Sequence, residues 1–158
     1  MQYILVGKIV NTHALKGEVR LISKFEYKYK VFIVNKKLYV GDKKEEFTIE
    51  SYRKHKGFDM IKFKEINSIN DALCIKSKNV YSLKDEFHDI ILDDDLKDLP
   101  CYYNNIMIGK VKEIINNNGY KVFNIDKYFI PYNNNFIEYL SKEKIVFKNI
   151  KELLDYKE

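Results

Sequence analysis

The amino-acid sequence predicts an all-β protein made of two small domains, on three observations. First, the 158 residues include 13 Tyr and 10 Phe, and aromatic residues, like the abundant Val and Ile, favour the half-buried faces of strands. Second, apolar and polar residues alternate over short segments of the first half, as in strands with one buried face. Third, asparagine-rich turns separate short segments of the second half at spacings of roughly 8–12 residues, which is typical of a barrel or sandwich.

Six short strands account for most of the first half. In residues 17–23, Val19 and Leu21 fall on one face and charged residues on the other. Residues 54–57 form a turn that contains a glycine, so the alternating segments on either side are expected to form a hairpin. The expected strands are residues 17–23, 30–34, 37–40, 47–52, 59–64 and 79–83.

One short helix is expected between the last two of these strands. Ser68 and Asp71 have the spacing of a capping box, with Asp in place of the usual Glu or Gln. Ile69, Ala72 and Leu73 follow at helical spacing and would form the apolar face of this helix.

Short strands also account for the second half, where Asn and Gly, which tolerate positive φ, mark the turns. Pro131 indicates an edge strand or a bulge, because proline cannot donate a hydrogen bond to a ladder. Residues 150–156 are expected to form a short helical turn. The expected strands are residues 101–103, 106–115, 120–125, 128–132, 136–140 and 144–148.

Charge divides the sequence into a basic and an acidic part. Residues 1–84 hold 18 Lys and Arg against 9 Asp and Glu, a net charge of +9, whereas residues 85–158 hold 10 Lys against 14 Asp and Glu, a net charge of −4. We therefore expect a basic domain at 1–84, an acidic linker at 85–96 and a second domain at 97–158. A basic domain suits a phosphate backbone and an acidic one suits a basic protein. Lysines that serve solubility alone are the alternative interpretation.

The sequence lacks the motifs of common catalytic and cofactor sites. Neither Gly-x-x-x-x-Gly-Lys-Ser/Thr nor Gly-x-Gly-x-x-Gly occurs. His13, His55 and His88 are far apart in the sequence, and none of them is part of a His-Glu-x-x-His motif. Cys74 and Cys101 are expected to pack in the core, with a Cys–His nucleophile pair assembled in space as the alternative. We therefore expect no enzyme activity, no metal and no cofactor.

A cytoplasmic location is expected. Two cysteines without Cys-x-x-Cys spacing suit a reducing compartment. The first eight residues lack the basic region of a signal peptide. No run of 18 apolar residues, which a membrane-spanning helix would need, occurs in the sequence.

The most specific motif lies near the start of the chain. Residues 6–20 read VGKIVNTHALKGEVR, and this segment resembles the opening of the RimM ribosome maturation factors. The matching positions are Gly7, Ile9, His13, Leu15, Lys16, Gly17, Glu18, Val19 and Arg20. The resemblance continues, more loosely, through residues 61–66, 70–73, 97–99, 108–111, 130–132 and 153–154.

Two departures from the family pattern stand out. Ala14 replaces a glycine that is usual in the family, so its turn must either avoid positive φ or tolerate strain. Many members carry paired aromatics, associated with subunit docking, where this sequence has Asp94 and Asp95. Tyr102 and Tyr103 lie a few residues beyond that position.

The resemblance implies a six-stranded barrel of the translation-factor type followed by a PRC barrel. It further implies a factor that binds the head of the immature small (30S) ribosomal subunit, through the nineteenth small-subunit protein and 16S rRNA. Such a factor assists 16S rRNA processing without cutting, as a monomer with no membrane or small-molecule partner. A general RNA-binding barrel protein is the main alternative, and an enzyme or metabolite-binding PRC module is the third.

Candidate contact residues follow from charge and from the motif. Gly17 is expected to give backbone freedom at a tight turn. His13 either fixes that turn or touches a partner, and a purely structural histidine with its hydrogen bonds satisfied is the alternative interpretation. The candidate phosphate contacts are Lys16, Arg20, Arg53, Lys54 and Lys56. The candidate ribosomal-protein contacts are Asp93, Asp94, Asp95, Tyr102 and Tyr103.

Overall fold

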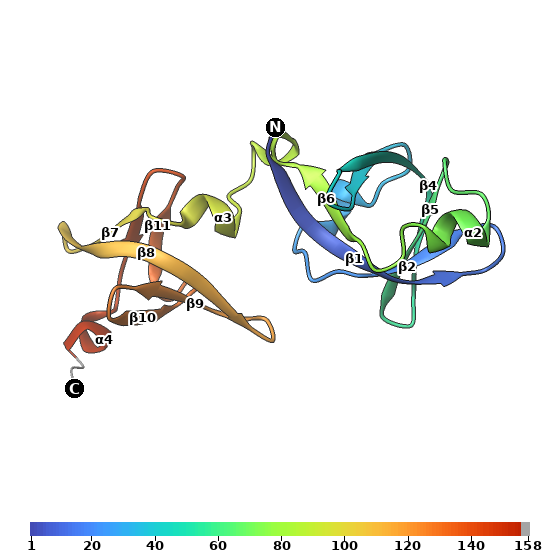
Figure 1. Cartoon of the computed structure of the whole chain (residues 1–158). Helices are drawn as coiled ribbons and strands as arrows, with labels where there is room; N and C mark the ends of the chain where they lie inside the picture. Colours follow the sequence, from blue (N-terminus) through green and yellow to red (C-terminus); the bar gives the residue numbers. More distant parts are fainter. Residues whose placement is uncertain (156–158) are drawn as a thin grey trace. The chain divides into compact units, whose positions relative to one another are not determined.

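The computed structural model describes residues 1–155 as two compact units, which adjoin in the sequence between Glu86 and Phe87 (Figure 1). Strands dominate both units, and each unit contains six of them. The predicted all-β class with two β domains is confirmed.

The first unit is a closed six-stranded barrel in the order β1-β2-β5-β4-β3-β6. Every pairing is antiparallel, and β1 closes the barrel by pairing with both β2 and β6. Two register shifts in β1 allow it to bend around the barrel, because a bulge kinks a strand and increases its twist. The strands are β1 (Tyr3–His13), β2 (Glu18–Ile22), β3 (Lys37–Val40), β4 (Glu45–His55), β5 (Phe58–Phe63) and β6 (Asn79–Leu83).

The barrel core consists of the inward residues of these strands. Val19 and Leu21 of β2 are fully buried, as are Ile49 of β4 and Ile61 of β5. The predicted alternation in β2 and the hairpin of β4 and β5 are therefore confirmed. In that hairpin, Lys56 and Gly57 both have positive φ, as a tight two-residue hairpin turn requires.

The strand predicted at residues 30–34 is wrong, because the chain forms the single-turn helix α1 (Lys28–Val31) there. Val31 and Phe32 are both buried. A strand would point consecutive side chains to opposite faces, whereas a helical turn directs both of them into the core. The first unit thus has two short α-helices rather than one.

Helix α2 (Ile69–Leu73) begins where predicted, but its apolar face is smaller than predicted. The Ser68 side chain accepts the Asp71 N–H at 3.1 Å. Only Ala72 of the helix is buried, and Leu73 is 52% exposed. Cys74 is also exposed, which contradicts the predicted core packing. The five-residue helix ends at Cys74, so the chain turns away before a second helical turn could pack.

The second unit contains a six-stranded sheet in the order β10-β9-β8-β7-β12-β11. Strands β7 and β12 pair in parallel, and the other neighbours are antiparallel. Proline at 131 lies in β10, an outer strand of this order, as predicted. The strands are β7 (Pro100–Tyr103), β8 (Ile106–Asn117), β9 (Tyr120–Ile125), β10 (Tyr128–Pro131), β11 (Ile137–Leu140) and β12 (Ile145–Phe147).

Short helical turns complete the chain. The 3-10 helix η1 (Lys84–Phe87) and helix α3 (Asp93–Leu96) precede the second sheet, and helix α4 (Lys151–Asp155) follows it. Leu96 is fully buried in the core of the second unit, so part of the segment expected as a linker belongs to that unit. The predicted turn at 150–156 agrees with α4, although Tyr156 lies outside the described residues.

Cys101 and Phe123 lie in the core of the second unit. The Phe123 ring stacks on that of Tyr132, with 4.5 Å between the ring centroids. Burial raises the pKa of the Cys101 thiol to about 12, so this cysteine is a packing residue, as predicted.

Candidate nucleic-acid interface

The two arginines of the chain lie on either side of the same residue of β5. The register pairs Arg20 of β2 with Met60 and pairs Arg53 of β4 with the same Met60. Directly opposed residues share a face of the sheet, and the neighbours of Arg20 in β2 point into the barrel. Both guanidinium groups are thus carried on the outer face of the barrel.

Arg20 is held by an imidazole and an aromatic ring. Its Nη2 lies 3.2 Å from Nδ1 of His13, and its guanidinium carbon lies 4.9 Å from the centroid of the Phe58 ring. A guanidinium can only donate, so Nδ1 of His13 accepts and the imidazole proton is on Nε2. Within residues 1–155, the buried Nε of Arg20 has no hydrogen-bond partner. His13 therefore orients Arg20.

Arg53 makes a two-point ion pair with Glu18. Its Nε donates to Oε2 at 3.0 Å and its Nη2 donates to Oε1 at 2.8 Å. The hydrogen bond from Arg53 lowers the pKa of the Glu18 carboxyl despite the opposing effect of burial. Glu18 thus stays ionised and fixes the direction of the Arg53 guanidinium.

His55 lies beside His13 and the two arginines, although the sequence analysis did not select it as a contact residue. Its ring centroid lies 5.9 Å from that of His13, and it pairs with Phe58 across the hairpin. Desolvation lowers the pKa of His55, and the charges of Arg53 and Lys56 lower it further. The predicted hairpin could have indicated that His55 belongs with Arg53, because residues two apart in a strand lie on the same face.

The predicted lysine contacts are only partly brought together. Lys56 is exposed at the β4–β5 turn, and Lys16 is exposed at the turn between β1 and β2. Lys54 pairs with the buried Asp59, so it lies on the opposite face of β4 from Arg53. We call Arg20, Arg53, His13, His55 and Glu18 the arginine cluster.

The β1–β2 turn has strained backbone geometry and a close packing contact. Ala14 has φ 75° and Gly17 has φ 94°. Of the two alternatives for Ala14, avoiding positive φ or tolerating strain, the structure therefore shows the second. A Cβ atom on Gly17 would lie 2.9 Å from the carbonyl oxygen of Ile66 and 3.0 Å from that of Ser68. Glycine is thus required here because the turn lies directly against residues 66–68.

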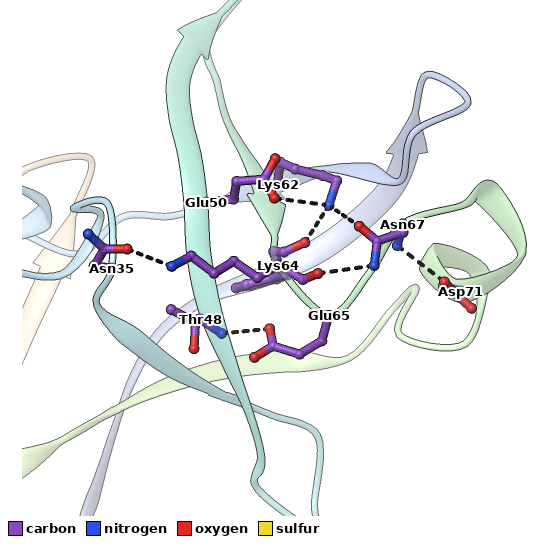
Figure 2. A network of polar contacts seen from close by, with 9 residues as sticks. Asn35, Thr48, Glu50, Lys62, Lys64, Glu65, Asn67 and Asp71 are labelled. Atoms are coloured by element: carbon purple, nitrogen blue, oxygen red, sulfur yellow. Dashed lines mark hydrogen bonds and ion pairs between the residues drawn. The ribbon is translucent and has the colours of Figure 1, made fainter.

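A network of polar contacts holds the segment that supports this turn (Figure 2). Lys64 donates from Nζ to Oδ1 of Asn35 at 2.8 Å, and the Thr48 N–H donates to Oε1 of Glu65 at 2.8 Å. The Asn67 N–H donates to Oδ2 of Asp71 at 3.2 Å. These contacts link residues 64–67 to Asn35, to β4 and to α2, so they hold in place the segment against which the motif turn packs.

The other family-motif glycine, Gly7, lies in β1 where the register with β6 shifts. A Cβ atom there would lie 3.1 Å from the Ile22 carbonyl oxygen. Gly7 therefore permits a close approach of β1 to β2 and does not itself form part of the arginine cluster.

The predicted acidic contacts are largely engaged within the second unit. Asp93 forms an ion pair with Lys121 at 3.0 Å. Asp95 accepts the Leu92 N–H at 2.9 Å, which caps α3, and lies 3.8 Å from Nζ of Lys142. Asp94 is exposed. These carboxylates therefore stabilise the start of the second unit.

The two predicted tyrosines face different ways. Tyr103 packs against the core of the second unit. Tyr102 is next to the buried Cys101 in β7 and is half-buried, so its side chain points to the outer face of the sheet.

The described residues also give two findings about other kinds of site. Across residues 1–155, no group of three or more His, Cys, Asp and Glu side chains is arranged to hold a metal ion. In the same residues, no helix has the length and apolar character needed to cross a membrane.

The model of the RimM N-terminal domain matches residues 4–87, which include the arginine cluster and all of the barrel except Tyr3. The chain belongs to the RimM family. The family resemblance of the motif at residues 6–20 is thereby confirmed.

Two relatives extend the match beyond the first unit of this RimM-family chain. The ribosome maturation factor RimM of Streptococcus mutans is 40% identical over 129 residues, which are 73% of this chain and 72% of the relative. The ribosome maturation factor RimM of Finegoldia magna is 36% identical over 154 residues, which are 90% of this chain and 93% of the relative. The second match includes both units.

A solved structure shares the fold of this RimM-family chain. It is the crystal structure of a Pseudomonas aeruginosa protein assigned as the 16S ribosomal RNA processing protein RimM, with a TM-score of 0.50 and 13% sequence identity. The alignment covers 93% of this chain and 97% of that protein. At this identity the likeness concerns the fold alone.

Proposed function

We propose that this RimM-family protein binds the head of the immature small ribosomal subunit, through 16S rRNA and the nineteenth small-subunit protein. In this proposal it is a cytoplasmic monomer that assists assembly and 16S rRNA processing without cutting the RNA. It uses no cofactor, membrane or small-molecule substrate. Its relatives are named ribosome maturation factors, which supports a role in ribosome maturation.

The observation that carries the proposal is the arginine cluster on the outer face of the barrel. Arg53 binds the Glu18 carboxylate, Arg20 contacts His13, and His13 lies near His55. Lys56 extends the positive charge to the hairpin tip. Guanidinium groups suit phosphate because they offer paired donors in a fixed plane. Each neutralised phosphate releases counterions, so binding should weaken as salt rises.

The proposed protein contact remains at the acidic start of the second unit. Asp94 is exposed on α3, where a basic ribosomal protein could approach it. Asp93 and Asp95 would support that contact indirectly, because their ion pairs and cap hold α3 in place. Charge complementarity of this kind speeds association more than it tightens the complex.

Co-sedimentation of the tagged protein with immature small subunits, mature small subunits and whole ribosomes tests the proposal. We expect preference for the immature small subunit. A variant with Lys16→Glu, Lys54→Glu and Lys56→Glu should bind less, and the loss should be larger at low salt. The matched control reverses the exposed lysines Lys24, Lys43 and Lys78, which changes the net charge equally on other parts of the barrel.

The outcomes separate this function from a general RNA-binding barrel protein. Equal binding to all three particles, abolished by an excess of naked RNA, would support the general RNA-binding protein instead. Unchanged binding of the Lys16, Lys54 and Lys56 variant at low salt would refute these three lysines as RNA contacts.

A further inference from the structure

A row of apolar side chains crosses four strands of the second unit. The register aligns Tyr139 of β11 with Val146 of β12, Val146 with Tyr102 of β7, and Tyr102 with Met107 of β8. Side chains directly opposite one another on neighbouring strands share a face. Tyr139 is 52% exposed and Met107 is 46% exposed, while the two central residues are half-buried.

This row lies on the side of the sheet that faces away from the core. Cys101, Ile145 and Phe147 alternate with Tyr102 and Val146 along the strands, and all three are buried in the core of the second unit. Successive side chains of a strand point to opposite faces. The row is therefore an outer surface, which we call the tyrosine face.

Lysines border the tyrosine face. Lys144 and Lys148 lie two residues before and after Val146, and Lys110 pairs with Pro100, two residues before Tyr102. Nζ of Lys144 lies 6.0 Å from the centroid of the Tyr139 ring. The one acid of β11, Glu138, lies at a register shift, so it is not paired with a residue of β12 in the row. The unit is acidic as a whole, but the border of this face is basic.

We propose that the tyrosine face binds single-stranded RNA. Sheet faces that carry exposed aromatic rings bind RNA by stacking unpaired bases on the rings, and basic residues beside them neutralise the phosphates. The exposed Tyr139 and the half-buried Tyr102 provide two rings on this face, with Val146 between them. The three lysines would repel a basic protein, so charge complementarity favours a polyanion. This inference deepens the proposed function, because it gives the second unit an RNA contact of its own.

Single-stranded and duplex RNA should behave differently at this face. In an A-form duplex the bases are stacked on one another, and the protein meets mainly phosphates and 2′-hydroxyls. A duplex could therefore use the lysines but not the tyrosine rings. Dependence on the rings is the property that distinguishes base stacking from a purely electrostatic contact.

The test measures fluorescence anisotropy of an unstructured 12-nucleotide RNA and of a duplex of equal length, with the full chain carrying Lys16→Glu, Lys54→Glu and Lys56→Glu. These changes are expected to reduce binding by the first unit. Adding Tyr102→Leu and Tyr139→Leu retains apolar volume but removes the rings, and should weaken single-strand binding by about tenfold or more. The control variant, Tyr120→Leu and Phe129→Leu, changes two other exposed aromatics and should bind as the parent does.

A second variant covers the possibility that the tyrosine changes disturb folding. Changing Lys110, Lys144 and Lys148 to Gln should lower the slope of log affinity against log salt by about 2, at roughly 0.7 for each phosphate contact with a single strand. Thermal unfolding midpoints close to that of the parent would show that each variant is folded.

The outcomes separate this inference from the proposed function. Single-strand binding that falls with the tyrosines supports the inference, even if the unsubstituted chain fails to co-sediment with small subunits, a failure that would overturn the proposed function alone. Folded leucine variants that bind RNA as the parent does would overturn the inference. If those variants kept RNA binding but lost co-sedimentation, the face would be a protein-docking surface, and the RNA inference would again be wrong.

Discussion

Arg53 and Glu18 form an ion pair in which both carboxylate oxygens accept from one guanidinium, at 3.0 and 2.8 Å. The pair joins β4 to β2, two strands that are separated by β5 in the barrel. The same carboxylate supplies the negative charge within the arginine cluster. Glu18 thus both fixes the direction of the Arg53 guanidinium and lowers the positive potential of the cluster.

Replacing Glu18 with Gln should tighten binding to RNA. The change removes the negative charge from the cluster while keeping a side chain that can accept from Arg53. We expect a severalfold gain in affinity at low salt, because the potential at the cluster becomes more positive. Titration with labelled RNA at two salt concentrations would measure it. Weaker binding of a folded Glu18→Gln variant would show that the ionised carboxylate is needed to orient Arg53.

RNA binding should strengthen as pH falls from 7.5 to 5.5, partly through His55. The pKa of His55 is lowered in the free protein by desolvation and by neighbouring cations, and a bound phosphate would favour its protonated form. His55→Gln should flatten this pH dependence. Affinity measured at four pH values with both proteins would test it, and equal pH dependence of the two would exclude His55.

The same shift in pKa affects folding in the opposite direction. In the unfolded chain His55 has its ordinary pKa and takes up a proton first as pH falls. Its contribution to stability is therefore present above the unfolded-state pKa and is lost as pH falls through the lower folded-state pKa. Urea midpoints at the same pH values should fall less for the folded His55→Gln variant than for the parent.

Asp59 is the buried acid whose loss should destabilise the first unit most clearly. It is 2% exposed, and it accepts from Nζ of Lys28 at 2.7 Å and from the Tyr52 hydroxyl at 2.5 Å. Burial, together with this hydrogen bond, raises the pKa of Tyr52. Asp59→Ala leaves both donors without their partner, so it should cost about 1–3 kcal/mol in the free energy of unfolding. Urea denaturation would measure it.

The matched control for Asp59 is Asp42→Ala, which removes an exposed acid and should change stability by no more than about 0.5 kcal/mol. Asp59→Asn, which keeps an acceptor for Tyr52, should lie between the two. A loss for Asp59→Ala no larger than that for Asp42→Ala would contradict the structural role of this acid.

Ala14→Gly should stabilise the protein. Alanine at φ 75° is strained by about 1–2 kcal/mol in the left-handed region, whereas glycine's extra freedom in the unfolded chain costs about 0.5–1 kcal/mol. We therefore expect a net gain of about 0.5–1 kcal/mol. Thermal or urea unfolding would measure it. Gly17→Ala should have the opposite sign, because its Cβ would meet two carbonyl oxygens.

Most strand positions were predictable because burial on one face of a sheet leaves a period of two in the sequence, but β1 (Tyr3–His13) was not among the expected strands. The alternation around Val19 and Leu21 has this form, and the structure follows it. Helix α1 was not predictable in this way, because a single turn is too short to show a helical period. Cys74 was misplaced for a related reason, since helical spacing indicates a face but not the residue at which the helix ends.

The arginine cluster was only partly predictable. Sequence analysis selected Arg20 and Arg53 for their charge, and the motif selected His13 and Glu18. The barrel order, in which β5 pairs with β2 and with β4, places both arginines opposite Met60. Such pairing depends on contacts distant in sequence, which local patterns do not encode. For the same reason the tyrosine face, which joins residues from four strands, became visible only with the register.

The parallel pairing of β7 with β12 has a consequence for the synthesis of the protein. The chain leaves the ribosome from its N-terminus, so the first barrel is complete once β6 has emerged, while β7 still lacks a neighbour on one side. That neighbour is translated last of all the strands. Closing so long a loop is entropically costly and slow. The two units should therefore fold at different times during translation, with the first barrel formed before the second unit.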